Sequence, residues 1–245
     1  MPPKVRDTSR RVPIEALNPH AFAPFGEVIQ NPRIHNGQPA LHKTEANQGT
    51  ATKWLDVSHM ENLYATEKRH GAKCVMTMFV CRPRELREGG LFDVEILERH
   101  PYTPQTFVPM GLGREDRETA YLVIVAPTLP TGAWDWQDLD HPGHDYGLAS
   151  WVADASGTHR ELGPPDLSKL KAFIARGDQA VTYGAATWHA PMVALGEKEI
   201  EFVVVQYANG RALDDVQEVE PVAQDGGKAF EVDLSRAIAV EKPKL

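Results

Sequence analysis

Cysteine is scarce in this chain of 245 residues, which contains only Cys74 and Cys81. Both lie in one apolar run, and a strand through that run would place them roughly 23 Å apart and on opposite faces. They cannot form a disulfide with each other, because bridged cysteines need Cα atoms within about 7 Å. The chain also lacks an Asn-x-Ser/Thr site and a secretory apolar run after Met1. These absences predict a reducing compartment and a cytoplasmic protein.

Long hydrophobic runs and an excess of basic residues are missing as well. The longest apolar stretch, residues 120–126, is far too short to span a bilayer, since a spanning helix needs about 20 apolar residues. With 34 acidic and 26 basic residues, the formal net charge is -8. That balance disfavours a broad basic face for nucleic acid or an anionic membrane. We therefore expect a small-molecule partner, no nucleic acid and no membrane.

Several common catalytic motifs are also absent. The sequence has no Cys-x-x-Cys, no His-Glu-x-x-His, no Gly-x-Ser-x-Gly and no Walker loop, and the Gly-x-Gly at 111–113 lacks a third glycine. These absences count against zinc proteases, serine hydrolases and nucleotide enzymes. A catalytic site in this chain must therefore be built from another group of polar residues.

Short apolar runs, punctuated by proline and glycine, make up much of the sequence. The clearest are residues 74–82, 120–127 and 199–208, and we predict that 74–82 forms a central strand. Strands at such intervals favour a sandwich or barrel over alternating strands and helices. A chain of this length is expected to have one core. The sequence thus predicts a mainly β protein with a few short helices.

Composition also predicts how the chain is divided. Residues 1–13 are basic and are predicted to be a mobile arm, residues 14–220 are predicted to form a single domain, and residues 221–245 turn polar and are predicted to be a tail. Within the domain, residues at about 128–163 are rich in Trp, Asp, His and Gly and have no period. They are predicted to be an insertion that forms an elaborated loop or lid.

One stretch has the period of a helix. Residues 165–177 place apolar side chains at helical spacing between Asp166, a predicted N-cap, and Gly177, a predicted C-terminal cap. They predict the one convincing helix of the chain. A short amphipathic helix is also predicted at 232–240.

Two polar groups interrupt the predicted strands, one in each half of the chain. Residues 91–110 contain Glu98, His100 and Gln105, and His189 ends another apolar strand ninety residues on. Period-two alternation puts Glu98 and His100 on one face of a strand. We predict that these residues meet in a barrel cavity, where an imidazole can act as acid, base or metal ligand. Purely structural interpretations stay open: either histidine could be bonded to a carbonyl, and Glu98 and Arg99 could be a surface charge pair.

Four stretches together resemble the ureidoglycolate lyase family. They are ANQGTATKW, ILERHPYTPQTFVPM, DLSKLKAFIARGDQAVTYGAATWHAPM and FVVVQYANGRALDDVQEVE, and the match covers most of residues 14–220 in the same order. The resemblance implies a cupin-like double-stranded β-helix barrel, usually a homodimer. It implies cleavage of (S)-ureidoglycolate to glyoxylate and urea in allantoin degradation, and a divalent metal (nickel, zinc or manganese) in some members.

Cleavage of ureidoglycolate requires a base for its hydroxyl and a proton for the departing nitrogen. His100, His189 and Glu98 are predicted to be catalytic, and the same three residues with Gln105 are the candidate metal ligands. The substrate carboxylate needs a cationic donor, for which Arg82 is favoured over Lys53. The residues predicted to contact the substrate are Arg82, Asn47, Lys53, Gln105, Tyr183 and Trp188.

Alternatives remain for both function and location. The same site could belong to a ureidoglycolate amidohydrolase, which releases ammonia, or to a non-catalytic sensor of small carboxylates. The C-terminal Pro-Lys-Leu is similar to the Ser-Lys-Leu peroxisomal address but differs at its first position. A peroxisomal location is therefore the alternative to a cytoplasmic one.

Overall fold

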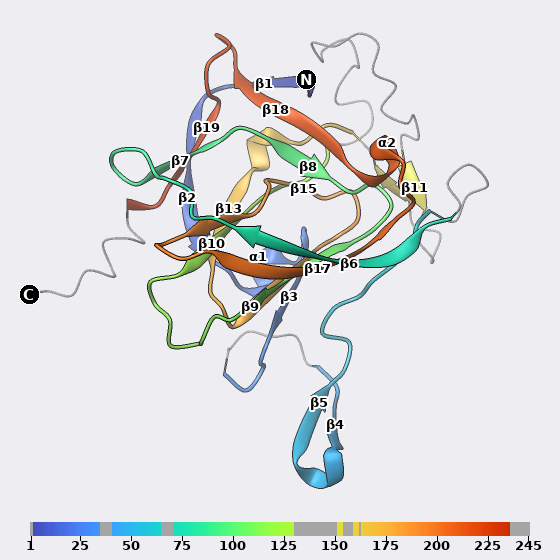
Figure 1. Cartoon of the computed structure of the whole chain (residues 1–245). Helices are drawn as coiled ribbons and strands as arrows, with labels where there is room; N and C mark the ends of the chain where they lie inside the picture. The colour runs from blue at the N-terminus through green and yellow to red at the C-terminus, as the bar shows by residue number, and fades with distance from the viewer. Residues whose placement is uncertain are drawn as a thin grey trace, which may run out of the picture.

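The computed structural model describes residues 2–34, 41–64, 71–129, 151–153, 159–161 and 163–235. Strands dominate these ranges, whose two α-helices, α1 (Pro19–Phe22) and α2 (Ala212–Asp215), have four residues each. The prediction of a mainly β fold with a few short helices is confirmed, and the curled sheets in Figure 1 form the expected cupin-like barrel. No helix within the described ranges is long and apolar enough to cross a membrane.

The larger of the two main sheets has ten strands. Its strands follow one another in the order β1, β18, β8, β15, β10, β13, β2, β19 and β7, and β16 pairs with β10 beside β15. Their bounds are Lys4–Asp7, Gln217–Ala223, Leu97–Arg99, Trp188–His189, Ala120–Ala126, Lys171–Ala175, Arg10–Ala16, Phe230–Asp233, Leu91–Val94 and, for β16, Val193–Leu195. The strands that carry the polar residues of interest, β8 and β15, thus lie side by side.

The second main sheet has five strands, in the order β3, β14, β9, β17 and β6. Their bounds are Gly26–Gln30, Gln179–Tyr183, Gln105–Met110, Ile200–Ala208 and Lys73–Cys81. A separate hairpin, β4 (Lys43–Ala46) and β5 (Ala51–Trp54), is joined by the 3-10 turn η1 (Asn47–Gly49) and projects from the barrel in Figure 1. Strands β11 (Trp151–Ala153) and β12 (His159–Glu161) form another small pair.

Strand β10 explains how the core is divided. All seven of its residues are buried, and alternate side chains enter two different clusters. Tyr121, Val123 and Val125 pack inside the barrel against the second sheet, while Leu122 and Ile124 pack on the opposite face. Each large apolar side chain that is fully buried contributes roughly 1.5–3 kcal/mol. The unbroken apolar run therefore reflects burial on both faces of one strand.

The predicted helix at 165–177 is wrong. Only a 3-10 turn, η3 (Leu167–Lys169), forms there, and it is followed by strand β13, which pairs with β10 and with β2. Asp166 makes no capping bond to the backbone, and its carboxylate accepts instead from the Ser168 hydroxyl. Neighbouring residues of β13 are buried in both core clusters, and two ladders with two-sided burial outweigh local helix propensity.

The two ends of the chain are also better integrated than predicted. Residues 1–13 are not a separate arm, because β1 pairs in parallel with β18 and β2 pairs with both β13 and β19. The predicted tail likewise begins inside β18 and includes β19. The predicted helix at 232–240 begins with the last residues of β19, and its residues 236–240 lie outside the described ones. Most of the predicted insertion at 128–163 lies outside them too.

Candidate active site

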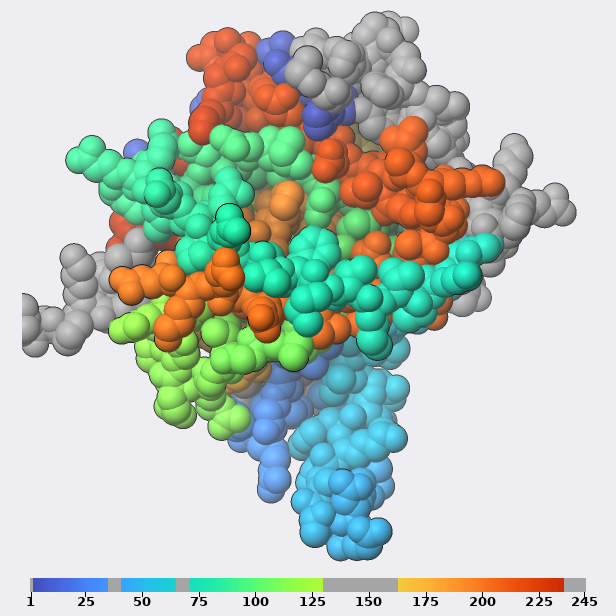
Figure 2. All heavy atoms as spheres, viewed as in Figure 1, coloured from blue at the N-terminus to red at the C-terminus, as the bar shows by residue number. Residues whose placement is uncertain are grey.

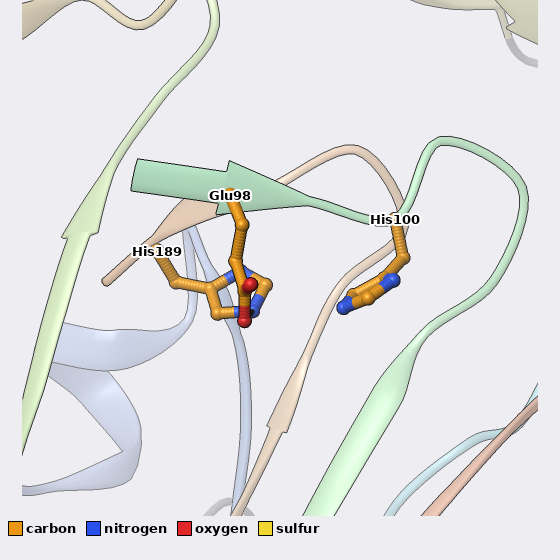
Figure 3. Close-up of side chains that lie close together, drawn as sticks. All are labelled: Glu98, His100 and His189. Carbon is orange, nitrogen blue, oxygen red and sulfur yellow. Dashed lines mark ion pairs between the residues drawn. The ribbon is translucent and has the colours of Figure 1, made fainter. Parts of the chain in front are cut away.

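Glu98, His100 and His189 come together at the junction of β8 and β15 (Figure 3). Glu98 lies in β8 directly opposite His189 of the antiparallel strand β15, and His100 immediately follows β8. One nitrogen or oxygen ligand atom from each residue lies within 4.8 Å of the other two. Because His189 is also paired with Val125 of β10, its side chain points to the interior of the barrel. The sequence-predicted trio therefore forms one buried cluster, hereafter the Glu98 cluster.

His189 is held on every side. Its Nδ1 lies 2.9 Å from the Thr187 carbonyl, and because a carbonyl only accepts, Nδ1 must carry a proton. Its Nε2 lies 3.2 Å from Oε1 of Gln105 and 3.6 Å from Oε1 of Glu98. The Tyr183 ring stacks on the imidazole, with 4.0 Å between centroids and 11° between planes. The ring is therefore fixed with Nε2 toward two acceptor oxygens.

His100 is held by one backbone atom. Its Nδ1 lies 2.6 Å from the carbonyl oxygen of Asp215 in α2, so Nδ1 is again the donor. Its Nε2 is buried and has no hydrogen-bond partner among the described residues. Burial, together with the charge of His189, lowers the pKa of His100 to about 4. The ring is thus neutral near pH 7, with a lone pair on an unpartnered Nε2.

Glu98 is the ionised member of the cluster. Burial by itself would raise the pKa of its carboxyl group, but the hydrogen bond and charge of His189 outweigh this effect, and the pKa is lowered. No lysine or arginine of the described ranges is hydrogen-bonded to the cluster, and the ion pair of Glu98 is with His189. Among the described residues, an anionic ligand bound here would therefore meet the Glu98 carboxylate without a lysine or arginine to offset its charge.

The side chains of Gln105 and Tyr183 lie beside the Glu98 cluster. Gln105, at the start of β9, donates from Nε2 to Oε1 of Gln206 in β17 at 2.5 Å, which turns its own Oε1 toward His189. The hydroxyl of Tyr183 is buried and has no partner among the described residues. Burial raises the pKa of Tyr183, with a smaller contribution from Glu98, so the phenol stays a neutral donor. Tyr183 and His100 therefore each present an unused polar atom to a ligand.

The residues present fit a divalent cation. In both histidines Nδ1 donates to a backbone carbonyl, which is the usual outer contact of an imidazole that binds metal through Nε2. A carboxylate oxygen of Glu98 is the third atom of the same group. Two imidazoles and one carboxylate suit transition metals such as zinc or nickel and leave coordination positions for a substrate.

The structure does not bring four of the predicted substrate contacts to the cluster. Arg82 is exposed over 88% of its side chain and pairs with Glu199, while Asn47 and Lys53 are exposed on the projecting hairpin. Trp188 lies beside His189 in β15, but alternation turns its side chain to the opposite face, where its indole N–H donates to the Gly163 carbonyl. These placements remove the structural basis for their predicted contacts with substrate in this chain.

The interpretation of Glu98 and Arg99 as a surface pair is wrong. Arg99 is buried, its guanidinium donates to Oε1 of Gln217 and to the Gly163 carbonyl, and it lies 4.4 Å above the Trp188 ring. Burial lowers the pKa of Arg99 to about 9. It packs behind β8, on the face opposite the cluster.

Sequence reasoning missed Gln206 and the backbone contacts of the two histidines. Gln206 had a signal, because it shares a face with Phe202 and Val204 and is the lone polar residue on that otherwise apolar face. The carbonyls of Thr187 and Asp215 had none, since every residue carries a carbonyl. Only the folded chain shows which of them meets an imidazole.

Comparison with known proteins gives one consistent result. The family model described as ureidoglycolate lyase matches residues 9–225. The ureidoglycolate lyase of Schizosaccharomyces pombe is 35% identical over 213 residues, which cover 85% of this chain and 91% of the relative. That of Saccharomyces cerevisiae is 35% identical over 204 residues (79% and 84%), and that of Burkholderia mallei is 30% identical over 202 residues (82% and 86%).

Proposed function

The chain belongs to the ureidoglycolate lyase family, and we propose that it cleaves (S)-ureidoglycolate to glyoxylate and urea at the Glu98 cluster. The observation that carries the location is the convergence of two buried imidazoles and one carboxylate within 4.8 Å. The cluster supplies a proton acceptor, a proton donor and unused polar atoms in a single buried place. Those are the groups that this elimination requires.

The reaction breaks one carbon–nitrogen bond without water or an oxidant. One carbon of ureidoglycolate carries a hydroxyl, a carboxylate and the ureido nitrogen. When a base removes the hydroxyl proton, the oxygen electrons form the aldehyde C=O, and the electrons of the C–N bond leave with the nitrogen. That nitrogen takes a proton, which gives urea, and the remaining fragment is glyoxylate.

The contacts of the two imidazoles support different proton roles. His100 is neutral and its Nε2 has an available lone pair, so it is the base that accepts the hydroxyl proton. Both ring nitrogens of His189 face acceptor oxygens. An imidazolium, which carries a proton on each nitrogen, would donate to these oxygens, and the carboxylate of Glu98 would stabilise its charge. His189 is then the acid that protonates the departing nitrogen. The Tyr183 hydroxyl is placed to donate a hydrogen bond to the bound substrate.

As the alternative to these acid and base roles, we propose that Glu98, His100 and His189 bind a divalent cation such as nickel, zinc or manganese, with Gln105 as an additional oxygen donor. When bound, the cation would lower the pKa of the substrate hydroxyl and offset the charges of Glu98 and the substrate carboxylate. Bound in this way, the two Nε2 atoms would be ligands instead of acid and base. The metal content of the purified protein, and turnover before and after chelation, discriminate between these uses.

Product analysis tests the proposed function. The purified chain is incubated with racemic ureidoglycolate, and urea, glyoxylate and ammonia are measured against time. Equal amounts of urea and glyoxylate without ammonia are expected for the lyase. Ammonia in place of urea would indicate the amidohydrolase alternative, and binding without products would indicate a sensor.

We propose that the protein is a homodimer, and a group of exposed apolar side chains supports this. Met76, Met78 and Val80 on the outer face of the edge strand β6 are exposed by 74%, 52% and 53%, and the register continues the patch through β17 to Val108 and Met110 of β9. Figure 2 shows β6 across the visible surface. Contiguous exposed apolar side chains mark contact sites. The mass measured by sedimentation should be twice that of one chain. The double variant Met76→Lys, Met78→Lys should have the mass of a single chain.

A further inference from the structure

The side chain of Tyr64 meets helix α2 at the carboxylate of Asp215. Asp215 is the residue whose backbone carbonyl contacts His100, and its side chain is not part of the Glu98 cluster. We propose that Tyr64 and Asp215 are positioning residues that hold the His100 ring with its Nε2 toward the substrate. The hydrogen bonds of both side chains go to residues outside the cluster, and each side chain would act through the backbone carbonyl of Asp215. The catalytic meaning of this role rests on the proposed function.

The carbonyl of Asp215 decides which nitrogen of His100 is free. It lies 2.6 Å from Nδ1 and can only accept, so it selects the neutral tautomer with the proton on Nδ1. If the carbonyl turned away, the proton could occupy either nitrogen, and Nε2 would be a donor for part of the time. A base needs the lone pair at Nε2, so the orientation of one peptide group controls the chemistry.

Helix α2 is too short to hold that peptide by itself. It has four residues, and isolated helices of one turn are unstable in water. The Asp215 side chain supplies the missing support, because Oδ1 accepts from the Asn209 N–H at 2.9 Å and Oδ2 accepts from the Gly210 N–H at 2.7 Å. The carboxylate thus ties α2 to the loop that precedes it.

Tyr64 adds the connection to the rest of the barrel. Its hydroxyl donates to Oδ1 of Asp215 at 2.8 Å, and the side chain is 1% exposed. Its ring packs against Tyr102, two residues after His100, with 5.4 Å between centroids. The Leu63 N–H donates to the Tyr102 carbonyl, and the Ala186 N–H donates to the His100 carbonyl. One buried phenol therefore links α2 to the loop that carries His100.

The hydroxyl of Tyr64 has a structural partner and so is not a substrate contact. Besides Asp215 Oδ1, it lies 3.3 Å from the Asp214 carbonyl and 3.4 Å from the Tyr207 carbonyl. Burial is the main cause that raises the pKa of Tyr64, and its hydrogen bond to Asp215 is the next. The hydroxyl therefore keeps its proton and remains a donor near neutral pH. This differs from Tyr183, whose hydroxyl has no partner in the described part of the chain.

The test removes the Tyr64 hydroxyl and compares the effect with that of removing another buried tyrosine hydroxyl. Tyr64→Phe is compared with Tyr121→Phe, because Tyr121 is also fully buried and donates to a backbone carbonyl, that of Gln179, with no link to His100. Kinetics with ureidoglycolate give kcat and KM separately. Nitrogen NMR of histidine-labelled full-length protein gives the tautomer of His100, which is assigned with His100→Gln.

We expect a single Nδ1–H tautomer in the wild type and in Tyr121→Phe, and a mixture of tautomers in Tyr64→Phe. Turnover of Tyr64→Phe should fall by about tenfold to a hundredfold, the scale for partners that orient a functional imidazole, with a much smaller change in KM. An unchanged tautomer in Tyr64→Phe, or an equal loss of kcat in Tyr121→Phe, would overturn the proposal.

A second variant covers the case in which Tyr64→Phe does not fold. Asp215→Asn keeps the size and the oxygen facing Tyr64 but turns an amide toward the Gly210 N–H, which loses one bond. It should also mix the tautomers, and retention of the wild-type tautomer and kcat would refute the positioning role. If the wild type forms no urea and glyoxylate, the proposed function fails, while the NMR comparison still decides whether Tyr64 and Asp215 position His100.

Discussion

The two halves of the site hold the same chemical group in different ways. His189 is part of a sheet, stacked by Tyr183, with acceptor oxygens around Nε2. His100 lies just after the end of β8, is anchored by one carbonyl of a four-residue helix and leaves Nε2 without a partner in the described chain. In the proposed reaction, the neighbouring acceptor groups, rather than the imidazoles themselves, would make one histidine the acid and the other the base.

Removing either imidazole should have the largest effect. His100→Ala and His189→Ala are each expected to lower turnover by at least roughly a hundredfold, the usual scale for a general acid or base, with the fold intact. Because the two act in one reaction, the double variant should be little worse than the worse single variant. Steady-state kinetics and circular dichroism provide the measurements. Near-normal turnover by either folded variant would show that the cluster is structural.

Glu98 tests the proposed acid more selectively. Glu98→Gln keeps the shape but removes the charge that stabilises protonated His189, and it should lower kcat by about tenfold to a hundredfold. The pH profile of kcat should therefore differ between Glu98→Gln and the wild type. Glu45→Gln, at an exposed position of the hairpin strand β4 and away from the cluster, is the matched control and should retain the wild-type profile. Identical profiles for wild type and Glu98→Gln would contradict the ion-pair role.

Titration of His100 should make stability depend on pH. Its folded-state pKa, about 4, is lower than the unfolded value near 6.5, so the unfolded chain binds more protons between these values. The contribution of this group is therefore present above pH 6.5 and is lost as the pH falls toward 4, by up to about 3 kcal/mol. Urea unfolding of wild type and His100→Gln at several pH values measures it. A parallel dependence in both proteins would exclude His100 as the source.

Arg82 should have the smallest effect. The sequence predicted that Arg82→Ala would chiefly raise KM, but the guanidinium is exposed and paired with Glu199. We now expect kcat and KM to stay within about twofold, as is usual for an exposed ion pair. A large rise in KM would show that Arg82 reaches a substrate site after all, such as one in a second copy.

Strands β6 and β10 show how far the fold could be predicted. Both are continuous apolar runs, and both were correctly predicted to be strands. However, β6 was predicted to be central and is an edge strand exposed along most of its length, whereas β10 is buried throughout. An apolar run indicates a strand, but it does not tell whether that strand lies inside a sheet or at its edge. Sequence therefore predicts strands better than their places in a sheet.

The site could be predicted only in part, because strand spacing is a local pattern and the remaining contacts depend on distant segments. Period-two spacing places Glu98 and His100 on one face, and the register of β8 with β15 then brings His189 to them. No local pattern reports which carbonyl meets an imidazole, because that depends on loops distant in sequence. The helix predicted at 165–177 failed in the same way, since the ladders on both sides of β13 come from residues far along the chain.

The pairing of His189 with Val125 has a consequence for how the protein fails on heating. Amides of a fully buried strand such as β10 exchange with solvent only when the whole domain opens, whereas a one-turn helix opens at a lower free energy. The two imidazoles therefore belong to units of unequal local stability. On warming, we expect the loop of His100 to separate from α2 while His189 is still ordered. Loss of activity should then precede melting, so that a four-residue helix rather than the core would set the upper working temperature.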